Sequence, residues 1–249
     1  MKHFIDLSDF TSKKLDLIIQ KAKQIKKNPE KFTSKCKNKT LGMIFQKEST
    51  RTRVSFAVGF QKLGGNVIEL KNESIGFGKR ESAEDIIKTL TQFIDLLVIR
   101  NNNHKLLKKL STLNSLPIIN GLSDFSHPCQ ILSDMLTINE NLGNIKHKRV
   151  TWIGDYNNVL RSLIELQIIY NFKLNVVLPK EIFKKNKLKV IKKNNKNLMI
   201  TNVIEEGVKY ADCVMTDAWI SMGEKETVLF AMHSRKISNK HRQPTLCAV

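Results

Sequence analysis

Short apolar runs rich in Ile and Val alternate along this chain with segments whose apolar residues recur at helical spacing. The runs predict buried strands, and the segments between them predict amphipathic helices. We expect strands at residues 41–45, 67–70, 96–99, 117–119, 150–153, 174–178 and 213–216. We expect helices at residues 8–27, 52–63, 84–92, 104–110, 129–141 and 158–170, the first of them capped by Ser8. The alternation indicates repeated βα units, and therefore an α/β fold with parallel sheets.

A polar stretch at residues 139–148, which contains Gly143, separates two runs of βα units. Polar segments that contain glycine commonly join domains. We therefore place a domain boundary here, which gives domains of residues 1–142 and 143–249. From Gly223 onward the βα rhythm is lost, and we expect an irregular segment there.

The formal net charge of +19 in 249 residues would attract the phosphates of nucleic acids. Much of the excess lies in lysines between Lys180 and Lys196, which are interleaved with asparagine. This run lacks the aromatic residues on which single-stranded nucleic acid stacks. We therefore interpret it as a solvated surface and expect no nucleic-acid partner, with a basic nucleic-acid binder as the alternative.

No stretch approaches the roughly 20 consecutive apolar residues that a membrane-spanning helix needs. The N-terminus, MKHFIDLSDF, also lacks the apolar region of a secretory signal. We therefore expect a cytoplasmic protein without a membrane partner. The four cysteines, Cys36, Cys129, Cys213 and Cys247, show no CxxC spacing, so neither a zinc site nor a disulfide framework is expected.

The pentapeptide Ser49-Thr50-Arg51-Thr52-Arg53 lies between an expected strand and an expected helix. Free backbone N–H groups at a helix start, hydroxyl groups and a forked guanidinium together favour an anion site, with phosphate as the natural ligand. The alternative is that Ser49 or Thr50 caps the helix while the arginines form surface ion pairs. The pentapeptide by itself does not separate these two interpretations.

A second polar cluster is His127-Pro128-Cys129-Gln130, at the start of another expected helix. Here a histidine and a glutamine three residues apart can converge on one polar group, such as a carbonyl with its amide nitrogen. The alternative is a helix cap or a buried structural histidine. Arg100 ends an expected strand, at the carboxyl edge where ligands of open α/β sheets bind, although strand-end arginines also occur as ordinary surface residues.

In the second half of the chain, Gly154-Asp155 closes an expected strand and Asn157-Asn158 opens a helix. This spacing is not GxGxxG, so it supports a dinucleotide site only weakly. Residues 216–223, TDAWISMG, place an acidic residue, an aromatic ring and a hydroxyl after an apolar strand. The acidic residue, Asp217, can bind an ammonium group. The alternative is a turn in which the aromatic ring anchors the core.

Five motifs in order resemble the transcarbamylase family: STRTRVSF at 49–56, LGG at 63–65, HPCQ at 127–130, GDYNNV at 154–159 and TDAWISMG at 216–223. The pair HPCQ and DxWxSMG is similar to the ornithine branch rather than to the aspartate branch. The resemblance runs through about nine tenths of the chain. It implies two doubly wound parallel-sheet α/β domains. Residues 1–142 would be the carbamoyl-phosphate-binding domain, and residues 143–249 an ornithine-binding domain that is incomplete at its C-terminal end.

The resemblance also implies roles for individual residues. The phosphate of carbamoyl phosphate would be held by Ser49, Thr50, Arg51, Thr52 and Arg100. The carbamoyl group would be bound by His127 and Gln130, and the catalytic residues would be His127 and Arg51. The amino-acid part of ornithine would be held by Asn158, Asp217, Ser221 and the backbone of Met222.

In the reaction that the resemblance implies, the side-chain amine of ornithine attacks the carbonyl carbon, phosphate leaves and citrulline forms. Orientation and stabilisation of developing charge suffice for such a step, so we expect no metal or organic cofactor. The family further implies a role in arginine biosynthesis and a homotrimer with sites between subunits.

Two departures from the family pattern change this expectation. Residues 74–80, SIGFGKR, lack the glutamine that the family usually places there to reach a neighbouring subunit's site. After TDAWISMG the family continues to an HCLP loop and a terminal helix, whereas residues 232–235, MHSR, resemble only the start of that loop. We therefore expect poor turnover of ornithine. The alternative to an efficient enzyme is a catalytically impaired transcarbamylase-like protein that binds its ligands.

Overall fold

The computed structural model describes residues 3–71, 81–183, 195–217 and 245–248. Several features expected from the sequence lie outside the described residues, namely segment 74–80, most of the lysine run and segment 232–235. The chain divides into two compact units, residues 1–132 and 133–249. The division falls within helix α6 (Pro128–Asn141), ten residues before the boundary of 142/143 that the sequence predicts, and the polar stretch at residues 139–148 begins in the last turn of this helix.

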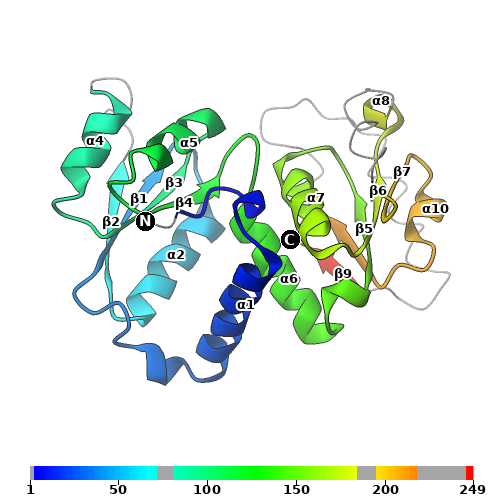
Figure 1. Cartoon of the computed structure of the whole chain (residues 1–249), viewed down its shortest axis with the longest axis horizontal. Helices are drawn as coiled ribbons and strands as arrows, with labels where there is room; N and C mark the ends of the chain where they lie inside the picture. Colours follow the sequence, from blue (N-terminus) through cyan, green and yellow to red (C-terminus); the bar gives the residue numbers. More distant parts are fainter. Residues whose placement is uncertain (1–2, 72–80, 184–194, 218–244, 249) are drawn as a thin grey trace. The chain divides into compact units, whose positions relative to one another are not determined.

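Unit 1 builds its sheet from four parallel strands, β1 (Thr40–Phe45), β2 (Asn66–Lys71), β3 (Leu96–Arg100) and β4 (Ile118–Leu122). Their order across the sheet is β2-β1-β3-β4. The described helices of this unit are α1 (Ser12–Lys27), α2 (Thr50–Lys62), α4 (Ala83–Leu90) and α5 (His104–Thr112), with 3-10 turns η1 (Leu7–Asp9) and η2 (Pro29–Phe32) (Figure 1). Parallel strands need crossover connections, and a helix lies in each of them.

The side chains of β1 alternate between two hydrophobic clusters, and these clusters show which helices cover each face of the sheet. Leu41, Met43 and Phe45 form one cluster, against which Phe56 of α2 packs. Ile44 belongs to a larger cluster with residues of α4 and α5. Successive side chains on a strand point to opposite faces, so α2 covers one face while α4 and α5 cover the other.

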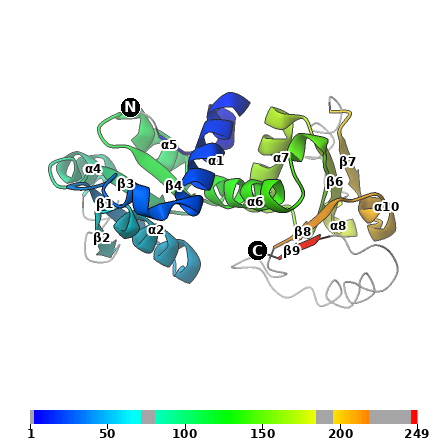
Figure 2. The same ribbon diagram turned by 90° about the horizontal axis from the view of Figure 1, so that it is seen from below.

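Unit 2 contains five described parallel strands, β5 (Arg149–Ile153), β6 (Lys173–Val177), β7 (Leu198–Thr201), β8 (Cys213–Thr216) and β9 (Thr245–Ala248). Their order is β7-β6-β5-β8-β9, and Figure 2 shows β9 beside β8 at one edge. The helical elements are η3 (Ile145–His147), α7 (Asn158–Tyr170), α8 (Lys180–Phe183) and α10 (Ile204–Val208). The first strand of the unit therefore lies in the middle of its sheet.

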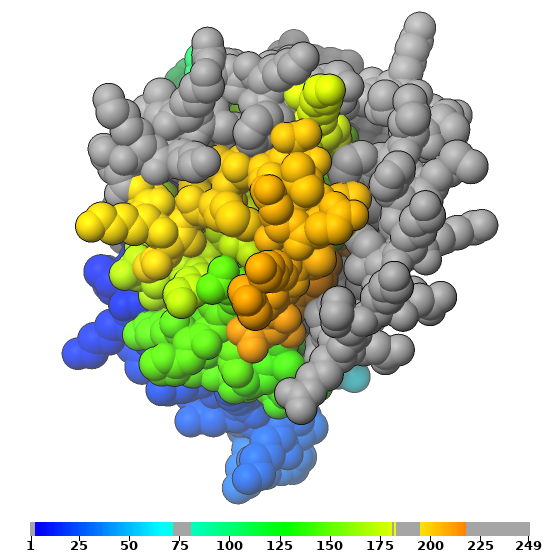
Figure 3. Space-filling model, turned by 90° about the vertical axis from the view of Figure 1, so that its right-hand side faces the viewer, coloured from blue at the N-terminus to red at the C-terminus, as the bar shows by residue number. Residues whose placement is uncertain are grey.

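Helix α10 covers one face of the second sheet. Ile153, Val177 and Val214, from three neighbouring strands, pack against Ile204 and Val208 of this helix. Helix α7 lies on the other side of the sheet, as Figure 1 shows. In Figure 3 the segment that contains β7 and α10, coloured yellow to orange, forms much of the visible surface of unit 2. Both faces of the sheet are thus covered, as parallel sheets require.

The structure confirms the α/β class with parallel sheets and corrects individual elements. The expected cap at Ser8 is wrong, because Ser8 lies inside turn η1. Thr11 caps α1 instead, and its Oγ1 accepts a hydrogen bond from the Lys14 N–H at 3.4 Å. The sequence pattern does not predict β7, which follows a lysine-rich polar stretch. The irregular segment expected from Gly223 onward is wrong at Thr245–Ala248, which form strand β9 beside β8. In the part of the chain that the structure describes, no helix is long and apolar enough to cross a membrane.

Candidate functional site

Among the strands that the structure describes, each sheet has one topological switch point, where the strand order reverses. In unit 1 the chain runs from β1 outward to β2 and then returns to β3 on the other side of β1. In unit 2 it runs from β5 through β6 to β7 and returns to β8 on the other side of β5. Ligands of open parallel sheets bind beyond the carboxyl ends of the two strands that flank such a point. The segments that follow β1 and β3, and those that follow β5 and β8, are therefore the candidate sites.

The first candidate site begins where α2 follows β1. Ser49 is the N-cap residue of α2, and among the described residues its side chain accepts no hydrogen bond from a helix N–H. Its hydroxyl oxygen instead accepts a hydrogen bond from Arg100 Nη1 at 3.2 Å. The N–H groups of the first turn, which contains Thr50, Arg51 and Thr52, are therefore not covered by the cap. An open helix start of this kind binds anions, because its N–H groups and its dipole both favour negative charge.

Arg100 is the buried cation of this site. It is the last residue of β3, pairs in register with Phe45 of β1, and is only 7% exposed. Loss of hydration lowers the pKa of its guanidinium, but arginine stays charged at pH 7. The described part of the chain supplies no carboxylate partner for it, and no hydrogen bond for its Nε. A buried charge without a counter-ion is costly, so this position favours an anionic ligand.

The two arginines of the STRTR segment have different surroundings. Arg51 is exposed and forms no ion pair with any residue that the structure describes. Arg53 Nε lies 3.3 Å from Glu69 Oε1 on β2, and its guanidinium lies 5.3 Å from the centroid of the Phe45 ring. The interpretation as a surface ion pair therefore fits Arg53, whereas Arg51 is available to a ligand.

His127 is a buried residue directly before α6, with 8% of its surface exposed. Burial, and to a smaller extent the positive charge of Arg100, lower the pKa of its imidazole to about 4. The ring is therefore neutral at pH 7, with one nitrogen that donates and one that accepts. Gln130 lies in the first turn of the same helix and is half-buried. A neutral imidazole near a buried guanidinium can hydrogen-bond an uncharged polar group attached to a bound anion.

Cys129, between these two residues, does not act as a nucleophile in this arrangement. Its thiol donates a hydrogen bond to the carbonyl oxygen of Asn120 on β4 at 3.5 Å. Burial raises the pKa of the thiol to about 12, so the reactive thiolate is scarce at neutral pH. We interpret Cys129 as a residue that holds the start of α6 against the sheet.

The second candidate site has a different helix start. Asn157 caps α7, and its Oδ1 accepts hydrogen bonds from the N–H groups of Val159 and Leu160 at 3.1 and 3.0 Å. Its Nδ2 donates to Asp217 Oδ2, beyond the end of β8, at 2.8 Å. Asn158 is the first residue of α7 and is half-buried. The cap thus covers the helix N–H groups and fixes a carboxylate, which favours a cationic group rather than an anion.

The structure brings Ser49 and Arg100 together in unit 1, and Asn157 and Asp217 together in unit 2. Two further expected site residues, Ser221 and Met222, lie outside the described residues. Sequence reasoning assigns no ligand-site role to Asn157. An asparagine directly before an apolar helix is nevertheless a recognisable cap signal, and this signal points to the position.

Two family models match the chain. Residues 2–140 match the carbamoyl-P binding domain of aspartate/ornithine carbamoyltransferase, and residues 146–241 match its Asp/Orn binding domain. The chain therefore belongs to the aspartate/ornithine carbamoyltransferase family.

Individual relatives agree with this family. The chain is 38% identical over 229 residues to the ornithine carbamoyltransferase of Brucella ovis, covering 91% of this chain and 73% of that protein. It is 36% identical over 245 residues to that of Aquifex aeolicus, covering 96% of this chain and 80% of that protein. The crystal structure of anabolic ornithine carbamoyltransferase from Campylobacter jejuni aligns with a TM-score of 0.86 at 28% identity, covering 100% of this chain and 86% of that one. The ornithine carbamoyltransferase from Pyrococcus furiosus aligns with a TM-score of 0.83 at 34% identity, covering 95% and 77%.

Proposed function

We propose that this chain is an ornithine carbamoyltransferase, which transfers the carbamoyl group of carbamoyl phosphate to the side-chain amine of ornithine. One observation carries the proposal: Arg100 is a buried guanidinium, without a carboxylate partner in the described residues, and it is hydrogen-bonded to Ser49 at an open helix start. The names of the relatives support the same reaction. The products are citrulline and phosphate, and we place the reaction in arginine biosynthesis in the cytoplasm.

In this proposal the phosphate group binds at the start of α2. Its oxygens accept hydrogen bonds from first-turn N–H groups and from the side chains of Ser49, Thr50, Arg51, Thr52 and Arg100. Arg100 supplies a buried charge from the sheet, and Arg51 supplies a second guanidinium from the exposed side. Both charges stabilise the phosphate as it leaves, when its negative charge grows.

His127 and Gln130 bind the carbamoyl group next to the phosphate. A neutral imidazole can donate a hydrogen bond to the carbonyl oxygen, and this bond strengthens as the oxygen becomes negative. The amine nitrogen forms a bond to the carbonyl carbon, the bond from that carbon to the phosphate oxygen breaks, and the amine loses a proton. With a pKa of about 4, His127 is a weak base, so we assign it hydrogen-bond donation rather than removal of that proton.

The amino-acid part of ornithine binds at the start of α7. Asp217, oriented by Asn157, pairs with the α-ammonium group. Asn158, Ser221 and the backbone of Met222 complete the ornithine-binding residues in our proposal. The fixed carboxylate discriminates against aspartate as a substrate, because a second carboxylate beside it would be repelled.

We further propose that the chain forms a homotrimer through the face of unit 1 that α2 covers. Val54 and Val58 of α2 are 53% and 42% exposed. Exposed apolar residues on one side of a helix favour an interface between chains. Light scattering of the purified protein at micromolar concentration should give the mass of three chains, and a monomer would contradict this part of the proposal.

The test is an assay of the purified chain with carbamoyl phosphate and ornithine, in which citrulline and phosphate should appear in equal amounts. Aspartate in place of ornithine should give no product, and Arg100→Met should abolish turnover. Calorimetric binding of carbamoyl phosphate without citrulline formation would favour the alternative of a catalytically impaired binding protein. Absence of both binding and turnover would contradict the proposed function.

A further inference from the structure

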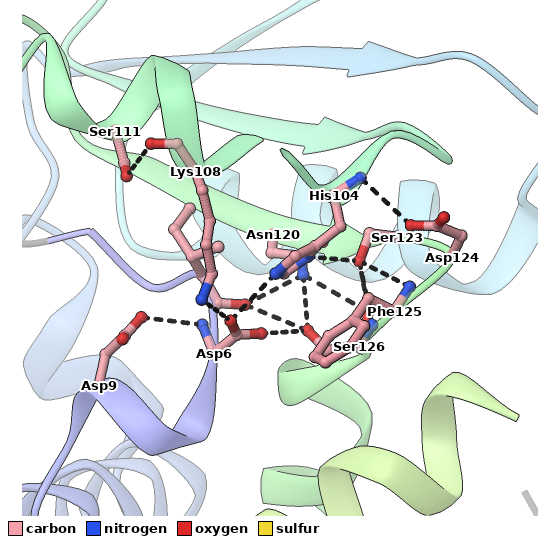
Figure 4. Close-up of polar contacts among 11 residues, drawn as sticks. Asp6, Asp9, His104, Lys108, Ser111, Asn120, Ser123, Asp124, Phe125 and Ser126 are labelled. Atoms are coloured by element: carbon pink, nitrogen blue, oxygen red, sulfur yellow. Dashed lines mark hydrogen bonds and ion pairs between the residues drawn. The ribbon is translucent and has the colours of Figure 1, made fainter. Parts of the chain in front are cut away.

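A buried carboxylate that the proposed reaction does not use lies near the N-terminus of unit 1. Asp6 is 1% exposed, and its Oδ1 accepts a hydrogen bond from Ser126 Oγ at 2.6 Å. Its Oδ2 lies 3.1 Å from His104 Nε2 and 2.9 Å from Lys108 Nζ. Figure 4 shows these side chains around the carboxylate. The start of the chain, helix α5 and the loop before α6 therefore meet at one negative charge.

This carboxylate keeps its charge although it is buried. Burial alone would raise the pKa of Asp6, but hydrogen bonds from His104, Ser126 and Lys108 outweigh burial and lower it to about 2. An ionised carboxylate only accepts hydrogen bonds, so both Ser126 Oγ and His104 Nε2 must donate to it. The direction of each bond is therefore fixed, and the loop is held in one arrangement.

Asn120 of β4 adds a second set of bonds to the same loop. Its Nδ2 donates to the carbonyl oxygen of Ile5 at 3.0 Å and to Ser126 Oγ at 3.1 Å. Its backbone N–H donates to the carbonyl oxygen of Phe4 at 2.8 Å, and Phe4 forms a parallel bridge with Ile119. The N-terminal segment thus runs along the edge strand of the sheet and brings Asp6 to the loop.

The loop of residues 123–126 is also closed on itself. Ser123 Oγ accepts hydrogen bonds from the N–H groups of Phe125 and Ser126 at 3.3 and 3.0 Å, and His104 Nδ1 lies 2.9 Å from it. The Ser123 N–H donates to the Ser126 carbonyl oxygen at 2.9 Å. The residue that follows this loop is His127. Asp6 therefore acts on the backbone of His127 through Ser126, to which it is hydrogen-bonded. His104 acts on it through Ser123, which in turn accepts a hydrogen bond from the Ser126 N–H.

The chain of contacts from Ser123 through His104 to Asp6 has the order of a serine hydrolase triad, but its environment excludes that function. Ser123 has 0% of its surface exposed, so no substrate can reach its hydroxyl oxygen. That oxygen also already accepts hydrogen bonds from two backbone N–H groups. We therefore interpret the cluster as a support for the loop rather than as a second active site.

We infer that Asp6 is a positioning residue for the carbamoyl end of the site, orienting His127 through Ser126. This inference rests on the proposed function. Asp6 bonds to Ser126, His104 and Lys108, whereas the Arg100 side chain bonds to Ser49, so neither phosphate-binding residue contacts Asp6 directly. Loss of its contacts should therefore misplace His127 and leave the phosphate-binding groups in place. Asp6 thereby sets how strongly the site prefers carbamoyl phosphate over inorganic phosphate.

The test compares Asp6→Asn with the wild-type chain in calorimetric titrations with carbamoyl phosphate and with inorganic phosphate. We expect the Kd for carbamoyl phosphate to rise about tenfold, because a misplaced His127 loses its hydrogen bond to the carbamoyl group. The Kd for inorganic phosphate should change less than about twofold, which also shows that the variant is folded. The value of kcat should fall by more than the KM for ornithine rises, and Asp6→Glu should restore part of the loss.

Asp95→Asn is the matched control, because Asp95 also accepts bonds from a lysine and a backbone N–H but lies before β3, at the amino end of the sheet. It should leave the ratio of the two Kd values unchanged. If Asp6→Asn raises both Kd values in parallel, or neither, the positioning role is overturned while the proposed function stands. If the wild-type chain binds inorganic phosphate but not carbamoyl phosphate, the proposed function and this inference both fail. Ser126→Ala, which removes one hydroxyl, supplies the same comparison if Asp6→Asn does not fold.

Discussion

The helix starts at the two switch points occupy equivalent places in their sheets and differ in how their N–H groups are satisfied. At the start of α2, Ser49 turns its hydroxyl toward Arg100 and leaves the helix N–H groups open. At the start of α7, Asn157 covers two N–H groups and holds Asp217. The first site combines an open helix start with a buried cation, and the second combines a capped helix with a carboxylate. The same topology therefore gives an anion site in one unit and a cation site in the other. The difference comes from whether the cap residue covers the helix N–H groups and from the charge of the residue at the end of the neighbouring strand.

This difference matches the two substrates of the proposed reaction. Carbamoyl phosphate is an anion, and ornithine carries ammonium groups at neutral pH. An open helix start next to Asp217 would attract a phosphate to the wrong unit, whereas the Asn157 cap removes that attraction. Asn157 thus contributes to selectivity for ornithine in two ways: it covers N–H groups that would bind a phosphate, and it orients the carboxylate of Asp217.

Replacing Arg100 with methionine should disrupt the anion site most strongly. We expect carbamoyl-phosphate binding to weaken by about 2–5 kcal/mol, the cost of removing one partner of a buried charge pair. The free energy of unfolding of the ligand-free protein should stay the same or rise, because the variant removes a buried charge that no described carboxylate balances. Calorimetry measures the affinity, and urea denaturation measures the stability.

Arg53→Met is the control for this variant. Arg53 pairs with Glu69 at a partly exposed position, so we expect a stability loss of at most about 1 kcal/mol. The affinity for carbamoyl phosphate should not change. Equal losses of affinity in the two variants would contradict the special role of Arg100. They would show that the affinity for carbamoyl phosphate depends only on the net charge of unit 1.

The pH dependence of stability should report on His127 in the first site. Its pKa is about 4 in the folded protein, against 6.5 for an unperturbed histidine. Between these values the unfolded chain binds a proton that the folded chain does not, so the free energy of unfolding falls as pH decreases from about 6.5 to about 4. The full loss is about 3 kcal/mol, at about 1.4 kcal/mol per pKa unit.

Asp6 affects stability in a separate pH range. Its pKa is lowered from 3.8 to about 2, so the stability that it contributes is lost only below about pH 4.

Urea denaturation at pH 7 and at pH 4.5 measures the effect of His127. His127→Gln should flatten the dependence of stability on pH within that window, since glutamine does not titrate. His147→Gln, at a position that the structure places in an exposed 3-10 turn, is the control and should keep the wild-type dependence. A full wild-type slope in His127→Gln would show that the burial of His127 is not the cause.

Arg51→Ala tests the exposed side of the anion site. We expect carbamoyl-phosphate binding to weaken by about 1.5–3 kcal/mol, the scale of a hydrogen bond to a charged group. Stability should change little, because Arg51 is exposed and has no ion pair among the described residues. Unchanged affinity in calorimetry would remove Arg51 from the site and leave Arg100 as its main cation.

Local patterns predict most of the strands and helices, because each depends on a few neighbouring residues. The helix predicted at residues 158–170 coincides with α7. The start of α1 was harder to predict, because both Ser8 and Thr11 have the chemistry of a cap and only the packing of Leu7, 0% exposed, places Ser8 in a separate turn. Strand β7 follows a polar, lysine-rich stretch and has only four residues, so no periodic signal marks it.

The sites were predictable only in part. The STRTR segment and the strand-end Arg100 carry local signals for an anion, and the structure places Ser49 and Arg100 in contact. The bond between Asn157 and Asp217 joins residues 60 positions apart, and that between Ser126 and Asp6 spans 120 positions. Such contacts depend on strand order and not on sequence neighbours, so composition and spacing do not reveal them. The roles of the individual site residues stay predictions.

Removing the two cap side chains should give the smallest effects and the most direct comparison of the two helix starts. Asn157→Ala removes the acceptor of two helix N–H groups, so we expect a loss of stability of about 0.5–2 kcal/mol. Ser49→Ala should cost clearly less stability, because within the described residues its hydroxyl accepts no helix N–H. It should nevertheless weaken carbamoyl-phosphate binding by about 0.5–1.5 kcal/mol, the net value of one hydrogen bond. Urea denaturation and calorimetry on both variants separate these outcomes. If Ser49→Ala lost as much stability as Asn157→Ala, Ser49 would be an ordinary cap, and the first turn of α2 would not be free to receive a phosphate.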